Sequence, residues 1–472
     1  MNGRMGAVVL AAAVWCVCVA GGESPAFADD PAVLEKLNAL GERSAVLLGK
    51  IKVEPAGVEK YHGALKNGPG RRDYGNKLVY AADRGTALYC GANHASPHRL
   101  NDVWEFHLAS NTWRMICAPG GDATRLRGMQ NEAKKAKDAI EKGTDVEKNK
   151  AELEKQEAAI KAWYAHVAVK DGYLQDTTNG GPVGPWHTWD GVTYDEKSKR
   201  LYWAVLDSDN FKEEKHRVHR SLTRSYAQVT GQDPEALVGQ LKPGSSMYYY
   251  DLEKGRWFKQ LGAEPFPIMR GMGGTLNYIP DLDKTVWYAC VGNTPGGYDE
   301  GMWAYDAKTN AWENVVPGPT TNGLMRQKKA PSEEIQAAYS VKHKKLVVVN
   351  KEMTFTFEFS SKTWTRVADN PGHGYDSHSV FAYDSNADVC LLLSKKGGQW
   401  SKEPWTLAAY DIGKDAWEVV EVQGQALHQD DPEKAWLSEQ RAGYYDPKLN
   451  VFVIYYGRSG QTFVYRHRAA QK

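Results

Sequence analysis

The chain has 472 residues, which is enough for one large domain or for two to three ordinary ones. It is 42% hydrophobic and 25% charged, the composition of a globular protein. The formal net charge is +1, so charge gives no support to nucleic acid or to an acidic surface as a partner.

The first 28 residues have the pattern of a secretory signal peptide. Arg4 gives a positive start, an apolar run of 14 residues follows (AVVLAAAVWCVCVA), and Ala26 and Ala28 supply small residues at the cleavage positions. The run is too short for a comfortable membrane span. We therefore expect cleavage near Ala28, no membrane span, and an exported protein that is periplasmic or extracellular.

Four cysteines remain after this segment, and they form no CxxC motif or Cys/His cluster, so a zinc site is not expected. Export permits disulfides, but three of the four lie inside apolar, strand-like runs, which favours buried free thiols. The four residues are Cys90, Cys117, Cys290 and Cys390.

One spacing recurs five times along the chain: an aromatic residue stands seven positions before a tryptophan, with turn-forming residues between. The pairs are Phe106 with Trp113, Tyr250 with Trp257, Tyr305 with Trp312, Phe357 with Trp364, and Tyr410 with Trp417. A hairpin between the two residues would place them side by side on adjacent antiparallel strands. The spacing therefore predicts a structural aromatic pair rather than a catalytic motif.

The last three intervals between these tryptophans are close to 50 residues, and each unit reads as four short strands. We expect six units, whose first strands open near Leu78, Val192, Leu276, Ala337, Val380 and Gly443. The sixth unit lacks its last strand, because the tryptophan expected after Tyr465 falls where the chain ends.

An open last unit would leave a row of unpaired backbone groups. The segment Lys50 to Gly57 (KIKVEPAG) resembles Trp113 to Gly120 in its alternation and its Pro/Gly ending, so it is expected to supply the missing strand. A short capped helix, with Asp30 before Pro31, precedes it. Residues 29–57 are thus predicted to be an N-terminal helix and a ring-closing strand.

The aromatic pairs resemble those of kelch-repeat propellers, of the kind found in the galactose oxidase central domain and in sialic acid mutarotases. The resemblance runs over about residues 76–468, although the kelch double glycine is clear only at Gly397 and Gly398. It implies an all-β fold: a six-bladed kelch-like β-propeller over residues 58–472, with a helical-hairpin insertion and the N-terminal strand closing the last blade.

Two insertions interrupt the pattern. Residues 122–170 predict a coiled-coil-like helical hairpin, since Val146, Leu153, Ile160 and Val167 are seven apart. Residues 207–246 predict two helices, the second with Asp233 as its cap and Pro234 at its first position. His216 and His219 are three apart on the first of them, but no third metal ligand is near, so exposed histidines are expected.

The segments that enter each unit, which we expect on one loop face, carry the candidate site. The tentative catalytic residues are His187, His378 and Tyr375; the candidate ligand-binding residues are Arg72, Trp186, Asp190, Arg270, Arg326, Asp376 and Arg441. Arginine grips a carboxylate with two hydrogen bonds. The alternative is that these arginines merely cap strand ends and pair with turn acids.

Two functions follow. The first is an exported binding protein, a monomer without a cofactor or metal, that recognises a carbohydrate or a protein on its loop face. The second is a glycan-active enzyme, an epimerase, mutarotase or polysaccharide lyase, with a His or Tyr base and arginine clamps. A copper oxidase is disfavoured, because the only Tyr-His dipeptide, Tyr61-His62, lies before the first unit. The sequence leaves open the ligand and whether turnover occurs.

Overall fold

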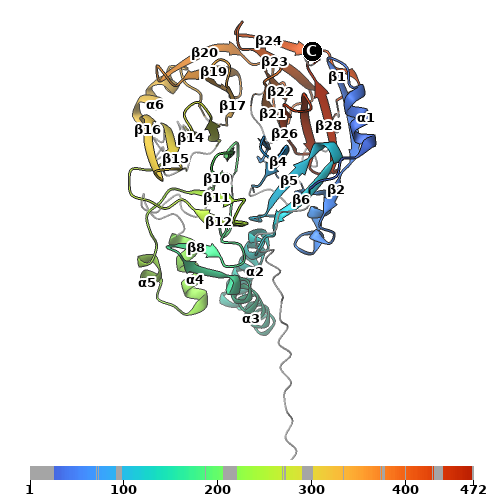
Figure 1. Ribbon diagram of the computed structural model, residues 1–472. Coiled ribbons are helices and arrows are strands. Elements are labelled where there is room, and N and C mark those ends of the chain that lie inside the picture. The colour runs from blue at the N-terminus through green and yellow to red at the C-terminus, as the bar shows by residue number, and fades with distance from the viewer. Residues whose placement is uncertain are drawn as a thin grey trace, which may run out of the picture.

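Figure 1 shows the computed structural model of the chain. The structure describes residues 26–70, 72, 74–91, 98–186, 188–205, 220–267, 269, 273–289, 301–332, 334–372, 374, 378–398, 400–427, 429 and 439–469. Within these residues the strands form six sheets of four or five strands and one of two.

The first three sheets follow one another along the chain. Sheet 1 contains β2 (Lys52–Glu54), β3 (Val79–Ala81), β4 (Thr86–Tyr89), β5 (Val103–His107) and β6 (Thr112–Cys117). Sheet 2 contains β9 (Val192–Asp195), β10 (Arg200–Ala204), β11 (Met247–Asp251) and β12 (Arg256–Lys259). Sheet 3 contains β13 (Thr275–Ile279), β14 (Lys284–Ala289), β15 (Gly301–Asp306) and β16 (Ala311–Val316).

The other three large sheets follow, and a small one precedes sheet 2. Sheet 4 contains β17 (Gln336–Ser340), β18 (Lys345–Val349), β19 (Met353–Glu358) and β20 (Thr363–Asp369). Sheet 5 contains β21 (Val380–Asp384), β22 (Val389–Lys395), β23 (Trp405–Asp411) and β24 (Ala416–Val420). Sheet 6 contains β1 (Ser44–Lys50), β25 (Gln423–Gly424), β26 (Arg441–Asp446), β27 (Val451–Tyr456) and β28 (Gln461–Arg466). The small sheet pairs β7 (Val167–Lys170) with β8 (Tyr173–Asp176).

The six large sheets lie around a common middle (Figure 1), and their first strands contact one another in the order β3, β9, β13, β17, β21 and β26, with β26 against β3. The buried hydrophobic residues gather into clusters, each between two neighbouring sheets. Second strands such as β18, β22 and β27 are continuous apolar runs because neighbouring sheets cover both of their faces.

The antiparallel ladders give every large sheet two distinct ends. We call the end at which the first strands begin the loop end, and the end at which the first and second strands are joined the hairpin end. At the loop end of sheet 6, Arg441 pairs with Tyr456, and at the hairpin end Asp446 pairs with Val451. Both predicted insertions leave the sheets at the loop end, because they follow the end of a fourth strand and the end of a second strand.

The predicted aromatic pairs are confirmed at all five positions. Each aromatic residue lies directly opposite its tryptophan on the adjacent strand, and the ring centroids are 4.9 to 5.5 Å apart. In sheet 6 the corresponding strand is β1, and Ala45 stands opposite Tyr465. The spacing is thus a packing feature of the outer hairpin, as the sequence indicated.

The N-terminal strand that completes sheet 6 is not the one predicted. Ser44–Lys50 pairs antiparallel with β28, whereas Lys52–Glu54 pairs parallel with β6 of sheet 1. The predicted strand, Lys50 to Gly57, therefore lies mostly on the wrong sheet. The prediction rested on the resemblance of this segment to Trp113–Gly120. A strand that pairs with β6 and a fourth strand of sheet 6 share the same alternation of polar and apolar residues, so the resemblance did not distinguish them.

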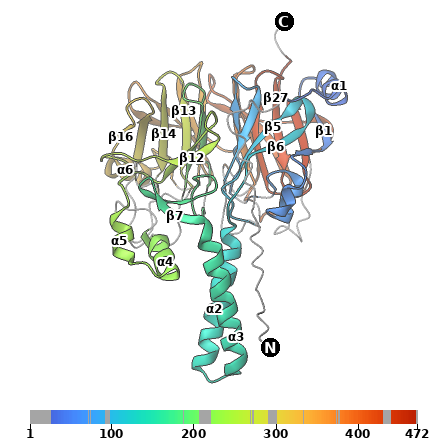
Figure 2. The ribbon, with the colours of Figure 1, turned by 60° about the horizontal axis from the view of Figure 1, so that its bottom comes forward.

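The helices agree with the predicted segments. α1 (Pro31–Ala39) has Asp30 as its N-cap, with the carboxylate accepting from the Ala32 amide at 3.0 Å. Residues 122–170 contain the hairpin of α2 (Ala123–Glu141) and α3 (Val146–Trp163), which extends away from the sheets (Figure 2). The second insertion contains α4 (Arg220–Thr230) and α5 (Pro234–Gly239), the latter capped by Asp233. His216 and His219 lie outside the described residues.

The remaining helical segments are short. α6 (Gly318–Arg326) leads into sheet 4, and the 3₁₀ turns are η1 (Val58–Lys60), η2 (Gly63–Asn67), η3 (Leu108–Ser110) and η4 (Tyr164–His166). The small β7–β8 sheet, which the sequence analysis did not anticipate, packs with the base of the α2–α3 hairpin in one cluster that includes Tyr164, Val167 and Leu174.

The fold class is corrected by these observations. The described strands form separate small sheets, no closed sheet joins them, and six α-helices accompany them. The strand expected to close the last unit also comes from other residues. The prediction of an all-β, six-bladed kelch-like β-propeller is therefore wrong in the form in which it was made.

Cys90, Cys117 and Cys390 are buried free thiols, as the apolar runs around them indicated. Burial raises the pKa of each thiol, so they remain protonated and unreactive at neutral pH. Cys290 lies outside the described residues.

A buried histidine at the end of sheet 6 makes the stability of the fold sensitive to acid. His467 is 3% exposed beside Tyr465, and burial, aided by Arg468 and Arg43, lowers its pKa from 6.5 to about 4. Because its folded pKa lies below the unfolded value, the stability it contributes is present above pH 6.5 and is lost as the pH falls towards 4. We expect a loss of at most about 3 kcal/mol from this group.

Urea unfolding at several pH values measures this loss. A His467→Gln variant, which keeps a polar side chain but cannot titrate, is expected to lose less stability than the wild type between neutral pH and pH 4. Equal losses in both proteins would contradict the assignment to His467.

Candidate functional site

A buried ion pair lies where the first strands meet. Lys77, just before β3, reaches Asp190, just before β9, with 3.3 Å between Nζ and Oδ2, and the two side chains are 13% and 3% exposed. The ammonium also donates to the carbonyl oxygen of Leu276 and to Oδ1 of Asn277, both at 2.9 Å. Burial lowers the pKa of Lys77 and raises that of Asp190, and the opposite charge of each partner resists the shift.

The same carboxylate ties two further sheets into this centre. Oδ2 of Asp190 accepts from Thr275 Oγ1 at 2.5 Å and from the Ala337 amide at 3.1 Å. On the opposite side, the carbonyl oxygen of Ser379 accepts from Asn76 and from Gln336. Asp190, predicted to bind a ligand, is thus placed in the contact between sheets 1 to 4.

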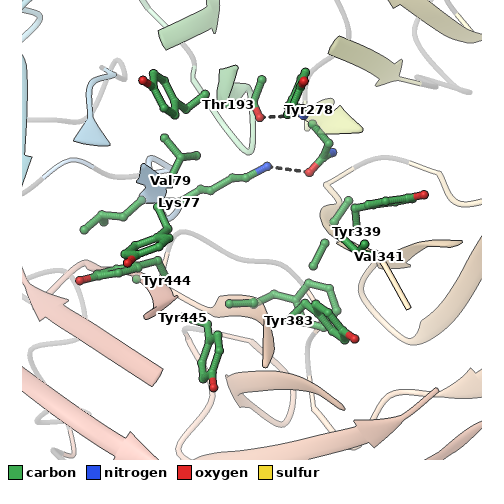
Figure 3. A pocket seen from close by; sticks show the side chains of 18 of the residues that line it. Lys77, Val79, Thr193, Tyr278, Tyr339, Val341, Tyr383, Tyr444 and Tyr445 are labelled. Carbon is green, nitrogen blue, oxygen red and sulfur yellow. Dashed lines mark hydrogen bonds between the residues drawn. The ribbon is translucent and has the colours of Figure 1, made fainter. Parts of the chain in front are cut away.

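A cavity of about 300 Å³ lies on the hairpin side of this ion pair, lined by residues of the first strands of all six large sheets. Each sheet contributes a tyrosine at the equivalent position of its first strand: Tyr80, Tyr194, Tyr278, Tyr339, Tyr383 and Tyr445. Figure 3 shows the Lys77 side chain extending across the cavity, while Tyr339, Tyr383 and Tyr445 point away from its middle.

The phenol groups are held by the hairpins. Tyr278 and Tyr383 donate to Asp283 and Asp388 of their own hairpins, each at 2.8 Å, and Tyr445 donates to Asn450 at 2.7 Å. Tyr194 and Tyr339 instead donate to Asp83 and Asp281 of the preceding sheets. Burial raises the pKa of all six phenols, that of Tyr80 to about 12, so they are neutral at physiological pH.

At the loop end, two predicted site residues come together around Trp405. The Arg441 guanidinium carbon lies 4.1 Å from the centroid of the indole ring, and the His378 ring lies edge-on at 6.5 Å. Lys395 adds a third basic side chain, with Nζ 5.6 Å from the same centroid. All four side chains are buried, so the contact is a preformed cation–aromatic cluster rather than a surface encounter.

The loop from β22 to β23 projects beside this cluster. Lys395 donates through Nζ to the Ser401 carbonyl oxygen at 3.0 Å, and the Ser401 amide donates to the Gly398 carbonyl oxygen at 3.0 Å. Gly397 and Gly398 adopt φ values of 78° and 80°, which only glycine takes readily, so this turn depends on both of them. The loop exposes 69% of Trp400.

The entry to sheet 2 holds a second aromatic and basic group. The guanidinium carbons of Arg99 and Arg127 lie 4.7 and 5.6 Å from the centroid of the half-buried Trp186 ring. Trp189 packs against Tyr74 with 4.4 Å between centroids. Trp189 has a φ of 53°, an uncommon conformation for a bulky residue and one that clusters at functional sites.

Arg72 occupies an internal position. Its guanidinium bonds Asp102 at 2.6 Å, the Gly91 carbonyl oxygen at 2.6 Å and the Pro69 carbonyl oxygen at 3.1 Å, and both charged side chains are fully buried. These contacts link the entry segment of sheet 1 to its interior. They match the alternative in which an entry arginine supports the fold, and the prediction of ligand binding by Arg72 remains untested.

Among the other predicted residues, one is described and stands apart from both groups. Arg326 is exposed at the last position of α6. His187, Tyr375, Arg270 and Asp376 lie outside the described residues. Among the predicted site residues that the structure describes, only His378 and Arg441 gather around one side chain.

Several residues of the central ion pair and of the loop-end cluster were not singled out from the sequence. Lys77, Lys395 and Trp405 belong to no sequence motif. Their contacts are made with residues that only the fold brings close. The tyrosine of the first strand left a partial signal, since three of the six units repeat Tyr-Asp there, at Tyr194, Tyr383 and Tyr445. The Tyr position was therefore visible, and its place at a cavity was not.

Two further features of the described residues bear on the class of site. Across the part of the chain that the structure describes, no group of three or more His, Cys, Asp or Glu side chains is placed to hold a metal ion. Among the same residues, no helix has the length and apolar character needed to cross a membrane.

Neither a protein-family model nor a curated protein matches the chain. Among similar solved structures is an auxiliary nutrient binding protein from Bacteroides ovatus ATCC 8483, with 8% identity and a TM-score of 0.39, covering 91% of this chain and 77% of that one. An auxiliary nutrient binding protein from Bacteroides thetaiotaomicron VPI-5482 has 7% identity and a TM-score of 0.40, with coverages of 89% and 76%. TM-scores this low do not support an inference about function. The resemblance to kelch-repeat proteins remains a prediction.

The central ion pair predicts a large loss of stability when one partner is removed. Lys77→Met would leave the buried Asp190 carboxylate without its counter-ion, and we expect a loss of about 3–5 kcal/mol of unfolding free energy. Replacing both partners, as Lys77→Met with Asp190→Asn, is expected to restore part of that loss.

Urea denaturation measures these differences. Lys308→Met is the matched control, because Lys308 also pairs with an aspartate, Asp283, but is 77% exposed, so little change is expected. A Lys77→Met protein as stable as the control would show that the pair does not hold the sheets together.

Proposed function

We propose that this is an exported binding protein that recognises a carbohydrate at the loop end, with Trp400 as the exposed contact. The observation that carries this is the exposure of a tryptophan, 69%, on a loop whose backbone is fixed by hydrogen bonds. An indole ring presents a flat apolar face, which suits the apolar face of a pyranose ring.

The fixed loop supports a binding role for Trp400. Ordering a side chain and its loop during binding costs free energy, and a loop held in place beforehand avoids part of that cost. Lys395 is the link, because it contacts Trp405 on one side and the Ser401 carbonyl oxygen on the other. The buried basic cluster thus sets the position of the exposed ring.

The charge of the cluster favours an acidic sugar over a neutral one. Arg441, Lys395 and His378 are three basic side chains that meet at one indole ring. Basic side chains attract carboxylates, so we propose a uronic or sialic acid rather than a neutral sugar as the ligand. A protein ligand, the other partner that the sequence left open, has no comparable observation in its favour among the described residues.

An enzymatic function requires more than this cluster shows. The hypothesis of a glycan-active enzyme needs His378 or His187 within hydrogen-bond distance of a Tyr or Asp, flanked by arginines. Arg441 does lie near His378, through Trp405, but His187 and Tyr375 lie outside the described residues. We therefore propose binding and leave catalysis as the second hypothesis.

A Trp400→Ala substitution tests the proposal. We expect the affinity for the best acidic oligosaccharide of a glycan panel to fall at least about tenfold, which is about 1.4 kcal/mol of binding free energy. The melting temperature should stay the same, because the side chain is mostly exposed. Isothermal titration calorimetry and a thermal melt measure the two quantities.

Val419→Ala is the control, since Val419 is 59% exposed on β24, the outer strand of the same sheet. It should leave both quantities unchanged. A wild-type protein that binds neither acidic nor neutral glycans, or a Trp400→Ala variant that binds them as well as the wild type, would refute the proposal.

A further inference from the structure

The cavity on the hairpin side of Lys77 is a second place where a molecule fits. It measures about 300 Å³, which is at the lower end of the range for small-molecule sites. The 53% exposure of Val341, one of its lining residues, indicates that the cavity opens to solvent there. Figure 3 places Val341 beside Tyr339 at the edge of this space.

Backbone groups give the cavity its polar character. Among the described strands, the first strand of each large sheet lies at the edge of that sheet, so one side of it has no partner strand. These edge strands are β3, β9, β13, β17, β21 and β26. Isolated bridges use part of these edges, at Lys77 with Gly443 and at Asp190 with Thr275. The remaining edges offer alternating N–H donors and C=O acceptors towards the middle.

The lining carries almost no uncompensated charge. The Lys77 ammonium is neutralised by Asp190, and its three donors reach Asp190, Leu276 and Asn277. The phenols are neutral, and those of Tyr278, Tyr383 and Tyr445 already donate to acceptors of the hairpins. Glu196 is the other charged lining residue. An anion would find no positive charge here beyond the one that Asp190 already neutralises, whereas a neutral molecule needs none.

We propose that the central cavity is a binding site for a small neutral polyhydroxyl molecule of the size of a monosaccharide. Each hydroxyl both donates and accepts, and so matches edges that alternate donors with acceptors. The C–H face of such a molecule can pack on the aliphatic chain of Lys77, which extends across the cavity. The proposal does not depend on carbohydrate binding at Trp400, which lies at the other end of the sheets.

Blocking the opening tests this site. Val341→Trp places a large ring at the edge of the cavity, and Val419→Trp makes the same change on an outer strand of similar exposure, 59%. With a panel of neutral monosaccharides and polyols, followed by saturation-transfer NMR and calorimetry, we expect Val341→Trp to weaken binding at least about tenfold. Val419→Trp should bind like the wild type.

Trp400→Ala separates the two sites. It should leave binding of the neutral panel unchanged, while Val341→Trp should leave binding of acidic oligosaccharides unchanged. Should Val341→Trp lower the melting temperature, the smaller Val341→Phe replaces it. The inference fails if no neutral monosaccharide or polyol binds at millimolar concentration, or if the Val341 variants bind as tightly as Val419→Trp.

Discussion

The buried pair of Lys77 and Asp190 is the constraint on which the middle of the molecule depends. Two charges removed from water are stable only if opposite charge and hydrogen-bonding groups surround them closely. Those groups come from β13, through Leu276 and Asn277, and from the start of β17, through the Ala337 amide. The pair thus requires four sheets to approach one point to within hydrogen-bond distance, and it penalises any arrangement in which one of them is displaced.

The pair also divides the middle of the molecule into two different environments. On the hairpin side the lining consists mainly of strand edges and of tyrosines such as Tyr278 and Tyr383, whose hydroxyl groups donate to carboxylates, and Glu196 is its charged residue besides Lys77. On the loop side, basic side chains meet indole rings at Trp405 and at Trp186. Under the two proposals, one chain carries two binding surfaces of different chemistry, with the Lys77–Asp190 salt bridge between them.

Local patterns in the sequence predicted local structure well. The interval from Tyr410 to Trp417 indicated a hairpin with facing rings, because both residues and the turn lie within one short stretch. Asp30 and Asp233 marked helix starts for the same reason. The closing strand was assigned wrongly because Lys50 to Gly57 resembles the fourth strand that contains Trp113, and only the positions of sheets 1 and 6 decide which segment pairs with β28.

The candidate site was less accessible from the sequence. His378 and Arg441 were selected because they enter units, and they do meet at one ring. Arg72 was selected on the same ground, yet its side chain points inward to Asp102. Whether an entry residue faces a ligand or the interior depends on the loops of the neighbouring unit, and a single sequence does not specify those contacts. Lys77 escaped notice for a related reason, since its acceptors Asp190, Leu276 and Asn277 are all far away in the sequence.

The N-terminal segment has a consequence for how the molecule comes apart. Strand β1 belongs to the last sheet and β2 to the first, and the single residue Ile51 separates them, with its amide held by the Gly460 carbonyl oxygen. Because peeling either strand away pulls on the other, we expect the first and the last sheet to unfold together. Neither end of the array of sheets can then unfold first by itself. Proteolytic cleavage at Ile51 would separate the two strands and allow one of these sheets to open independently.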